Sequence, residues 1–157
     1  MAKWVRIVVA MLICPSCGGS GTATSPTQAS IVATLSPNPV TSTFCSPSLC
    51  QAADGRFFRW RAEGTLTVQE TAGIAGSVTS ITVTAFNPQF VYTSDFIVRA
   101  SGTNRVAAHG TLAIPLSYLY GLVDNPLASR SVMLPYVVAF SDDRGNQLMA
   151  VATWTVN

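Results

Sequence analysis

The sequence contains few charged residues. Only 10% of its 157 residues are Asp, Glu, Lys or Arg, whereas about 25% is typical of soluble domains. Lysine occurs once, at Lys3, and over residues 17–157 seven arginines balance seven acidic residues. A neutral chain without basic clusters lacks the charges that neutralise phosphates. We therefore expect no nucleic-acid partner.

Groups that could converge in a catalytic site are also scarce. No Gly-x-Ser-x-Gly sequence is present to hold a nucleophilic serine on a sharp turn. The single histidine, His109, precedes Gly110 and is predicted to be a loop residue rather than part of a triad. The two glutamates, Glu63 and Glu70, show no pairing typical of a glycosidase. The sequence therefore predicts a protein that is not an enzyme and has no cofactor.

A long apolar run is missing as well. Crossing a membrane as a helix takes about 20 apolar residues, and no segment of the chain is that long and apolar. Residues 7–13 form a short apolar run that follows the positively charged Lys3 and Arg6. This order is typical of a secretory signal. Residues 1–16 are therefore predicted to be a signal peptide, with a buried strand as the alternative.

The residues that follow contain a cysteine in a small-residue context, Ser16-Cys17-Gly18-Gly19. Here the sequence resembles bacterial lipoproteins, in which a cysteine after a small residue is acylated and becomes the new N-terminus. The resemblance implies a lipid on Cys17, although Cys14 stands where the family usually has leucine. The alternative is ordinary cleavage near residues 21–23, which would give a freely secreted protein. Residues 17–30 are predicted to form the lipidation site and a flexible tether.

Export to an oxidising compartment makes Cys45 and Cys50 a predicted disulfide. The alternative is a zinc site, but zinc takes four ligands and the sequence offers no second cysteine pair or histidine cluster.

Residues 31–157 show the alternation of apolar and polar residues that is typical of strands. On residues 58–69 the apolar face holds Phe58, Trp60, Ala62, Leu66 and Val68. Trp60 and Trp154, each on the apolar face of its strand, are expected in the core. Further strands are predicted at residues 81–85, 96–100, 112–116, 132–140 and 148–156. Pro135 indicates a sheet edge or a bulge within its strand, because proline has no N–H to donate.

Turn sequences separate these strands at residues 36–39, 72–76 and 142–146. The pattern predicts an all-β fold, an antiparallel two-sheet sandwich of about seven strands. It is similar to the immunoglobulin-like and fibronectin type III-like sandwiches of bacterial envelope proteins, a resemblance that rests on strand rhythm.

Two groups of residues are candidate binding sites. Asp142, Asp143 and Asn146 place three oxygen donors in one turn, as calcium prefers, although a plain tight turn uses the same residue types. The second group consists of tyrosines in stretches that resemble loops and is predicted to face a sugar or a partner: Tyr92, Tyr118 and Tyr120.

The expected function is a binding or assembly module of the bacterial cell envelope, anchored to the membrane by a lipid. Few charges leave sheet edges open to strand addition, so an envelope protein or a second copy is an expected partner. The alternative is carbohydrate binding or adhesion through the tyrosines. The expected location is the periplasm or cell surface, or the medium if Cys17 is not acylated.

Overall fold

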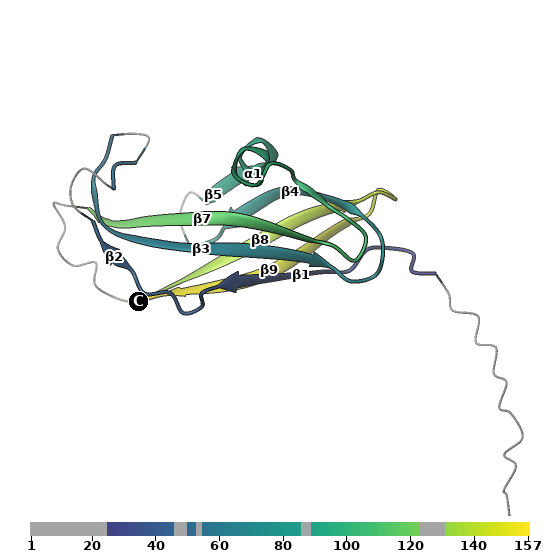
Figure 1. The fold of residues 1–157 in the computed structure, drawn as a ribbon, viewed down its shortest axis with the longest axis horizontal. Helices are drawn as coiled ribbons and strands as arrows, with labels where there is room; N and C mark the ends of the chain where they lie inside the picture. The colour runs from purple at the N-terminus through teal and green to yellow at the C-terminus, as the bar shows by residue number, and fades with distance from the viewer. Residues whose placement is uncertain (1–24, 46–49, 53–54, 86–88, 123–130) are drawn as a thin grey trace, which may run out of the picture.

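The computed structural model describes residues 25–45, 50–52, 55–85, 89–122 and 131–157. In these residues two antiparallel sheets pack face to face, with one short helix beside them (Figure 1). The sheets do not close into a barrel, and seven of the described strands have four or more residues. The predicted all-β sandwich is confirmed, and it is consistent with an immunoglobulin-like fold.

The first sheet, sheet A, is built around β3 (Phe58–Glu70). β7 (Thr111–Leu122) pairs with β3 along one edge over almost its whole length. β1 (Ile31–Ser36) and β2 (Thr43–Phe44) share the other edge of β3. β7 therefore has one open edge, where Pro115 is tolerated because no N–H is needed there.

The second sheet, sheet B, has the strand order β5-β4-β8-β9. A further strand, β6 (Arg105–Val106), pairs with the beginning of β4. The four main strands are β4 (Gly76–Val83), β5 (Phe90–Thr93), β8 (Val132–Asp142) and β9 (Gln147–Val156).

The edge position or bulge predicted from Pro135 is wrong, because β8 lies between β4 and β9 and is in regular register around this residue. The N–H of Thr84, one residue beyond β4, donates to the Pro135 carbonyl at 3.1 Å. The N–H and C=O of a strand residue point to the same side of the strand. The nitrogen of Pro135 therefore points to the β4 side, just past the last residue of β4. The β4–β8 ladder loses no hydrogen bond because of this proline.

Of the two tryptophans predicted in the core, Trp154 lies at its centre and Trp60 does not. Trp154 is fully buried, and its indole N–H donates to the Pro37 carbonyl at 2.8 Å. Gly64 of β3 makes room for this ring, since a Cβ at Gly64 would lie 2.6 Å from Cζ2 of Trp154. Trp60 points to the same side of sheet A but lies beyond the core and stays half-buried.

The strand predicted at residues 96–100 is wrong, because these residues belong to helix α1 (Ser94–Ser101). The helix begins after Thr93, carries Asp95 in its first turn and ends at Gly102, whose φ of 78° suits glycine. Its buried residue is Ile97, which the strand pattern put on the outer face. A short apolar run fits both the two-residue period of a strand and the 3.6-residue period of a helix, and the residues that flank it distinguish the two.

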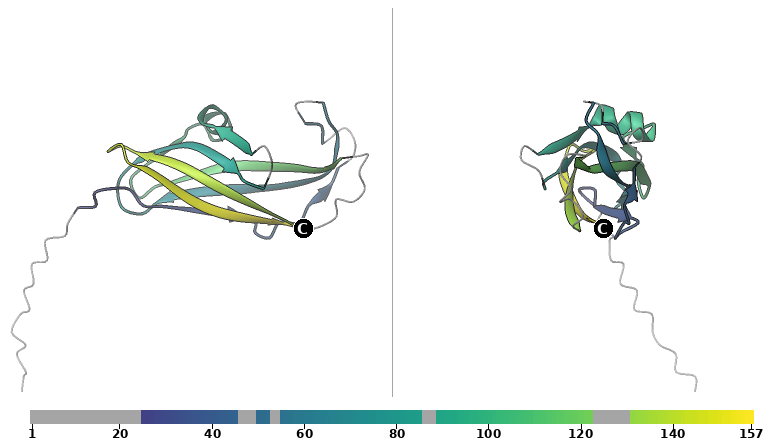
Figure 2. Two further views of the ribbon diagram at one scale, coloured as in Figure 1. Left: turned by 180° about the vertical axis from the view of Figure 1, so that it is seen from behind. Right: turned by 90° about the vertical axis from the view of Figure 1, so that its left-hand side faces the viewer.

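The sandwich is elongated, and its two ends differ. The predicted turns are confirmed where β1 ends, between β3 and β4, and between β8 and β9. The end with the β8–β9 turn, here called the hairpin end, receives the chain at residue 25, and the opposite C-terminal end carries β2 and Asn157 (Figures 1 and 2). The predicted signal peptide and Cys17 lie outside the described residues.

Candidate functional site

A buried glutamate organises the hairpin end. Glu70, the last residue of β3, is fully buried, and its carboxylate accepts four backbone N–H bonds. Ala72 and Gly73 donate from the turn that follows, both at 2.8 Å. Ser30 donates at 3.2 Å and His109 at 2.9 Å, from distant parts of the sequence. One side chain thus joins the N-terminal segment to two turns.

The protonation state of Glu70 follows from these contacts. Burial alone raises the pKa of a carboxyl group, but the N–H bonds from His109, Ala72, Ser30 and Gly73 outweigh it and lower the pKa from 4.5 to about 2. Glu70 is therefore ionised at neutral pH, with its charge balanced by backbone dipoles instead of a cation. This arrangement holds structure and leaves no proton to exchange near neutral pH.

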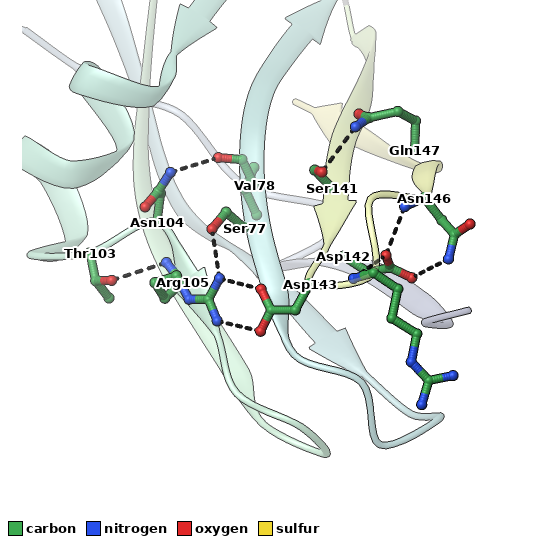
Figure 3. A network of polar contacts seen from close by, with 11 residues as sticks. Ser77, Val78, Thr103, Asn104, Arg105, Ser141, Asp142, Asp143, Asn146 and Gln147 are labelled. Carbon is green, nitrogen blue, oxygen red and sulfur yellow. Dashed lines mark hydrogen bonds and ion pairs between the residues drawn. The ribbon is translucent and has the colours of Figure 1, made fainter. Parts of the chain in front are cut away.

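Asp142 acts in the same way in the β8–β9 turn (Figure 3). Its carboxylate accepts the N–H groups of Arg144 and Asn146, the side-chain amide of Asn146, and the N–H of Ala29 at 3.0 Å. Burial raises the pKa of Asp142, but the bonds from Asn146, Ala29 and Arg144 prevail and lower it from 3.8 to about 2. The turn chemistry expected of these residues accounts for this pattern.

Asp143 faces a different partner. Both of its carboxylate oxygens accept from the guanidinium of Arg105, at 2.6 and 2.8 Å (Figure 3). The bond from Arg105 lowers the pKa of Asp143. In the part of the chain that the structure describes, no cluster of three His, Cys, Asp or Glu side chains is placed to hold a metal ion. The calcium interpretation of Asp142, Asp143 and Asn146 stays a prediction.

Residues 26–30, which the sequence placed in the tether, contact the domain. The carbonyls of Pro26 and Thr27 accept from Arg144 and Asn146, and Ala29 is buried in the core. Residues 26–30 are therefore held by the domain and do not behave as a free segment.

The two cysteines predicted to pair do so. The disulfide joins Cys45 and Cys50 with their Cα atoms 5.8 Å apart, within the range that a disulfide spans. It lies beside β2, because the Cys45 N–H donates to Arg59 and the Cys50 carbonyl accepts from Phe58. The crosslink therefore fastens the chain between β2 and β3 to sheet A.

The three candidate tyrosines lie in strands, not in loops. Tyr92 in β5 packs against Phe90 and Phe96, with ring centroids 4.7 and 4.6 Å away, and burial raises its pKa. It contributes to the edge of the core. Tyr118 and Tyr120 belong to β7 and stack on each other with centroids 5.3 Å apart and planes 13° apart.

Tyr118 and Tyr120 are part of a larger aromatic group at the C-terminal end, here called the aromatic cluster: Phe44, Trp60, Tyr118 and Tyr120. Tyr120 lies opposite Trp60 in the β3–β7 register, and Trp60 lies opposite Phe44. The Phe44 and Trp60 rings meet edge to face at 5.3 Å. Phe44 is 63% exposed, and the other three are half-buried.

The aromatic cluster exists because sheet A is longer than its core. The side chains of Trp60, Tyr118 and Tyr120 follow the alternation of the buried residues of β3 and β7. They therefore face the same side as the core, and Tyr118 and Tyr120 pack against its edge. The Tyr120 hydroxyl bonds to the Ser42 hydroxyl, which fixes that ring against the segment leading into β2. The result is a rigid surface of aromatic faces and edges.

Sequence reasoning missed Glu70 and Phe44. Glu70 was considered only as half of a catalytic pair, although its position before Thr71-Ala72-Gly73 is typical of a carboxylate that caps a turn. The residues next to Phe44 in the sequence do not indicate its role, because Phe44 meets Trp60 only when two separate strands pair. His109 lies in a turn, as predicted, with a φ of 55°.

Among the described residues, no helix has the length and apolar character needed to span a membrane.

Comparisons with known proteins give little guidance. No protein-family model matches the sequence, and no curated protein matches it. The structure is similar to Pseudomonas fluorescens alkylpurine DNA glycosylase AlkC bound to DNA containing an abasic site analog, with 10% identity and a TM-score of 0.39. The match covers 85% of this chain and 32% of the glycosylase chain.

This comparison contradicts the prediction that the chain is not an enzyme, because the matched structure belongs to an enzyme. At this TM-score and identity, the likeness does not show that the chain is an enzyme either.

Proposed function

We propose that the protein is a binding or assembly module of the bacterial cell envelope, tethered to the membrane by a lipid on Cys17. The observation that carries the proposal is the separation of the two ends of the sandwich. The chain enters at the hairpin end, where residues 26–30 are held by Arg144, Asn146, Asp142 and Glu70. The aromatic cluster lies at the opposite end (Figure 1).

This arrangement suits a tethered binding domain. Residues 17–24, fully extended, span at most about 28 Å. A lipid on Cys17 would therefore keep the hairpin end near the membrane and leave the C-terminal end directed away from it. The exposed aromatic surface would then face partners in the surrounding compartment.

The anchor is tested by intact mass spectrometry after expression of the full chain in a bacterium. We expect the protein in the membrane fraction, with the mass of the chain from Cys17 plus a diacyl or triacyl group. Cys17→Ser should move the protein to the soluble fraction, and Cys14→Ser serves as the matched control that should leave it in the membrane. Recovery of an unmodified soluble chain beginning near Thr24 would contradict the tether.

Carbohydrate binding is a second candidate, and the aromatic cluster favours it. Sugar-binding surfaces present aromatic faces to the apolar C–H side of a sugar ring, with a few polar groups nearby to fix orientation. The stacked pair of Tyr118 and Tyr120 and the exposed Phe44 provide such faces, with the Ser42 hydroxyl beside them.

A glycan array tests this second candidate. We expect binding by the parent protein and a loss of about tenfold or more on Phe44→Ala or Tyr120→Ala, because each removes an aromatic contact of roughly 1.5 kcal/mol. Phe90→Ala is the matched control, since Phe90 is an exposed aromatic residue of sheet B at 52% exposure. An array on which the parent binds no glycan would reject carbohydrate recognition without affecting the tether.

A further inference from the structure

The outer face of sheet B is uncharged across all four main strands. Cross-strand register defines it, because residues opposite each other share a face: Val91, Thr82, Val137 and Val151 form one row, and Thr93, Ser80, Ala139 and Met149 form the next. Beyond them lie Pro135 opposite Thr153 and Met133 opposite Thr155. These twelve residues, here called the uncharged face, include no ionisable side chain.

Most residues of the uncharged face are apolar, and four of the apolar ones are well exposed. Met149 is 77% exposed, Met133 65%, Val151 62% and Val91 48%. Large apolar side chains scattered singly on a surface need no explanation, but a contiguous group of them is typical of an interaction surface. No strand or helix among the described residues covers it, since α1 contacts β4, β5 and β7 and buries Ile97 in the core.

The outer face of sheet A provides the contrast. There the exposed alternation of β3 places Arg59, Arg61 and Glu63 in sequence, and Arg61 pairs with Glu63. Charges of this kind keep a sheet face in water, because burying them in an interface costs their hydration. The absence of charge is thus a property of the four main strands of sheet B, and the ion pair of Arg105 in β6 with Asp143 lies beside them at the hairpin end.

We propose that the uncharged face is the interface of a homodimer, in which the same face of a second copy covers it. A partner with charges at this position would lose their hydration without gaining an ion pair, whereas a second uncharged face loses nothing of the kind. Over residues 17–157 the acidic and basic residues balance, so two copies do not repel each other through net charge. Two-fold pairing of one surface with itself is the commonest form of soluble oligomer.

The size of the face fits this role. Strands spaced about 4.8 Å apart with a rise of about 3.3 Å per residue give the whole outer side of the four strands, of which the uncharged face is the larger part, a flat footprint of about 500 Å². A biological interface should clear about 1,000 Å² in total, or half of that from each partner. Two sheets packed face to face with aligned strands would repeat the packing within the sandwich. The inference does not depend on the lipid anchor.

Sedimentation velocity of the full chain over a dilution series tests the dimer. We expect a protein mass of twice that of the monomer, as mass spectrometry gives it for the same preparation, plus any bound detergent. Met149→Lys should weaken the dimer by about a hundredfold or more, because each copy would bury an unpaired ammonium group. Val32→Lys is the matched control, since Val32 is a 46% exposed valine of sheet A, and it should leave the dimer intact.

Any one of the following results overturns the proposal. A parent protein that sediments as a monomer at every concentration rejects it, and so does a dimer that Met149→Lys leaves unchanged while Val32→Lys disrupts it. A monomer that binds vesicles of neutral phosphatidylcholine, and loses this binding on Met149→Lys, would assign the face to a lipid surface instead. Thermal melts of both variants establish that they fold, and Met149→Gln, which adds no charge, should retain most of the association.

Discussion

Replacing Glu70 by alanine is expected to lower the free energy of unfolding by on the order of 3 kcal/mol. The substitution leaves the N–H groups of Ser30, Ala72, Gly73 and His109 without their acceptor. A buried donor without a partner costs about 1–3 kcal/mol, and water can reach only some of these four. Urea denaturation at neutral pH measures the loss.

Glu63→Ala is the control for this experiment. Glu63 lies on the same strand, is exposed and pairs with Arg61 on the surface, so we expect a change within about 0.5 kcal/mol. Equal effects of the two substitutions would contradict the role assigned to Glu70.

The same carboxylates make stability depend on acid pH. The folded-state pKa of Glu70 is about 2 against an ordinary 4.5, and that of Asp142 is about 2 against 3.8. Because folding lowers both values, the stabilisation is complete above the ordinary pKa values and is lost as the pH falls from about 5 towards 2. Denaturation midpoints of the parent should fall across this window, and Glu70→Gln should fall less steeply. A midpoint that rises on acidification would contradict the assigned ionisation.

Replacing Trp154 by alanine is expected to destabilise the fold by about 3–5 kcal/mol. The ring is fully buried, meets Tyr136 at 6.2 Å and fills the space left by Gly64. Its loss creates a cavity and also leaves the Pro37 carbonyl without the indole N–H. Thermal and urea unfolding measure the effect.

Two further variants isolate the causes. Trp154→Phe keeps most of the apolar volume but loses the bond to Pro37, so it should lower the free energy of unfolding by less than Trp154→Ala does. Val32→Ala, at an exposed position of sheet A outside the uncharged face, should change stability by no more than about 0.5 kcal/mol. If Trp154→Ala were no more harmful than Val32→Ala, the core would not be centred on this ring.

Local patterns were sufficient to predict most of the architecture. Alternation over β3 and β9 identified strands with one buried face, since the period of two follows directly from the pleat. Turn residues placed the boundaries after β1, between β3 and β4, and between β8 and β9. The five-residue spacing of Cys45 and Cys50, together with the expected compartment, was enough to predict their disulfide.

Other features depended on neighbours that are distant in the sequence. Residues 96–100 fit a strand and a helix equally well, and in the structure they form a helix that packs Ile97 into a core built by distant strands. Trp60 and Trp154 look alike in an alternating pattern, but only Trp154 lies where the opposite sheet covers it fully. Glu70 is an ordinary strand-end glutamate until Ser30 and His109 are brought beside it.

The sequence by itself determined the strand rhythm, the turns, the disulfide pair and the scarcity of charge, because each depends on residues that are near one another in the chain or on composition alone. Only the tertiary structure decided which residues share a surface. The pairing of β5, β4, β8 and β9 brings the uncharged face together from four separated segments. The pairing of β2, β3 and β7 likewise brings together the aromatic cluster of Phe44, Trp60, Tyr118 and Tyr120. These sites depend on which strands become neighbours, and strand pairing is a property of the whole chain.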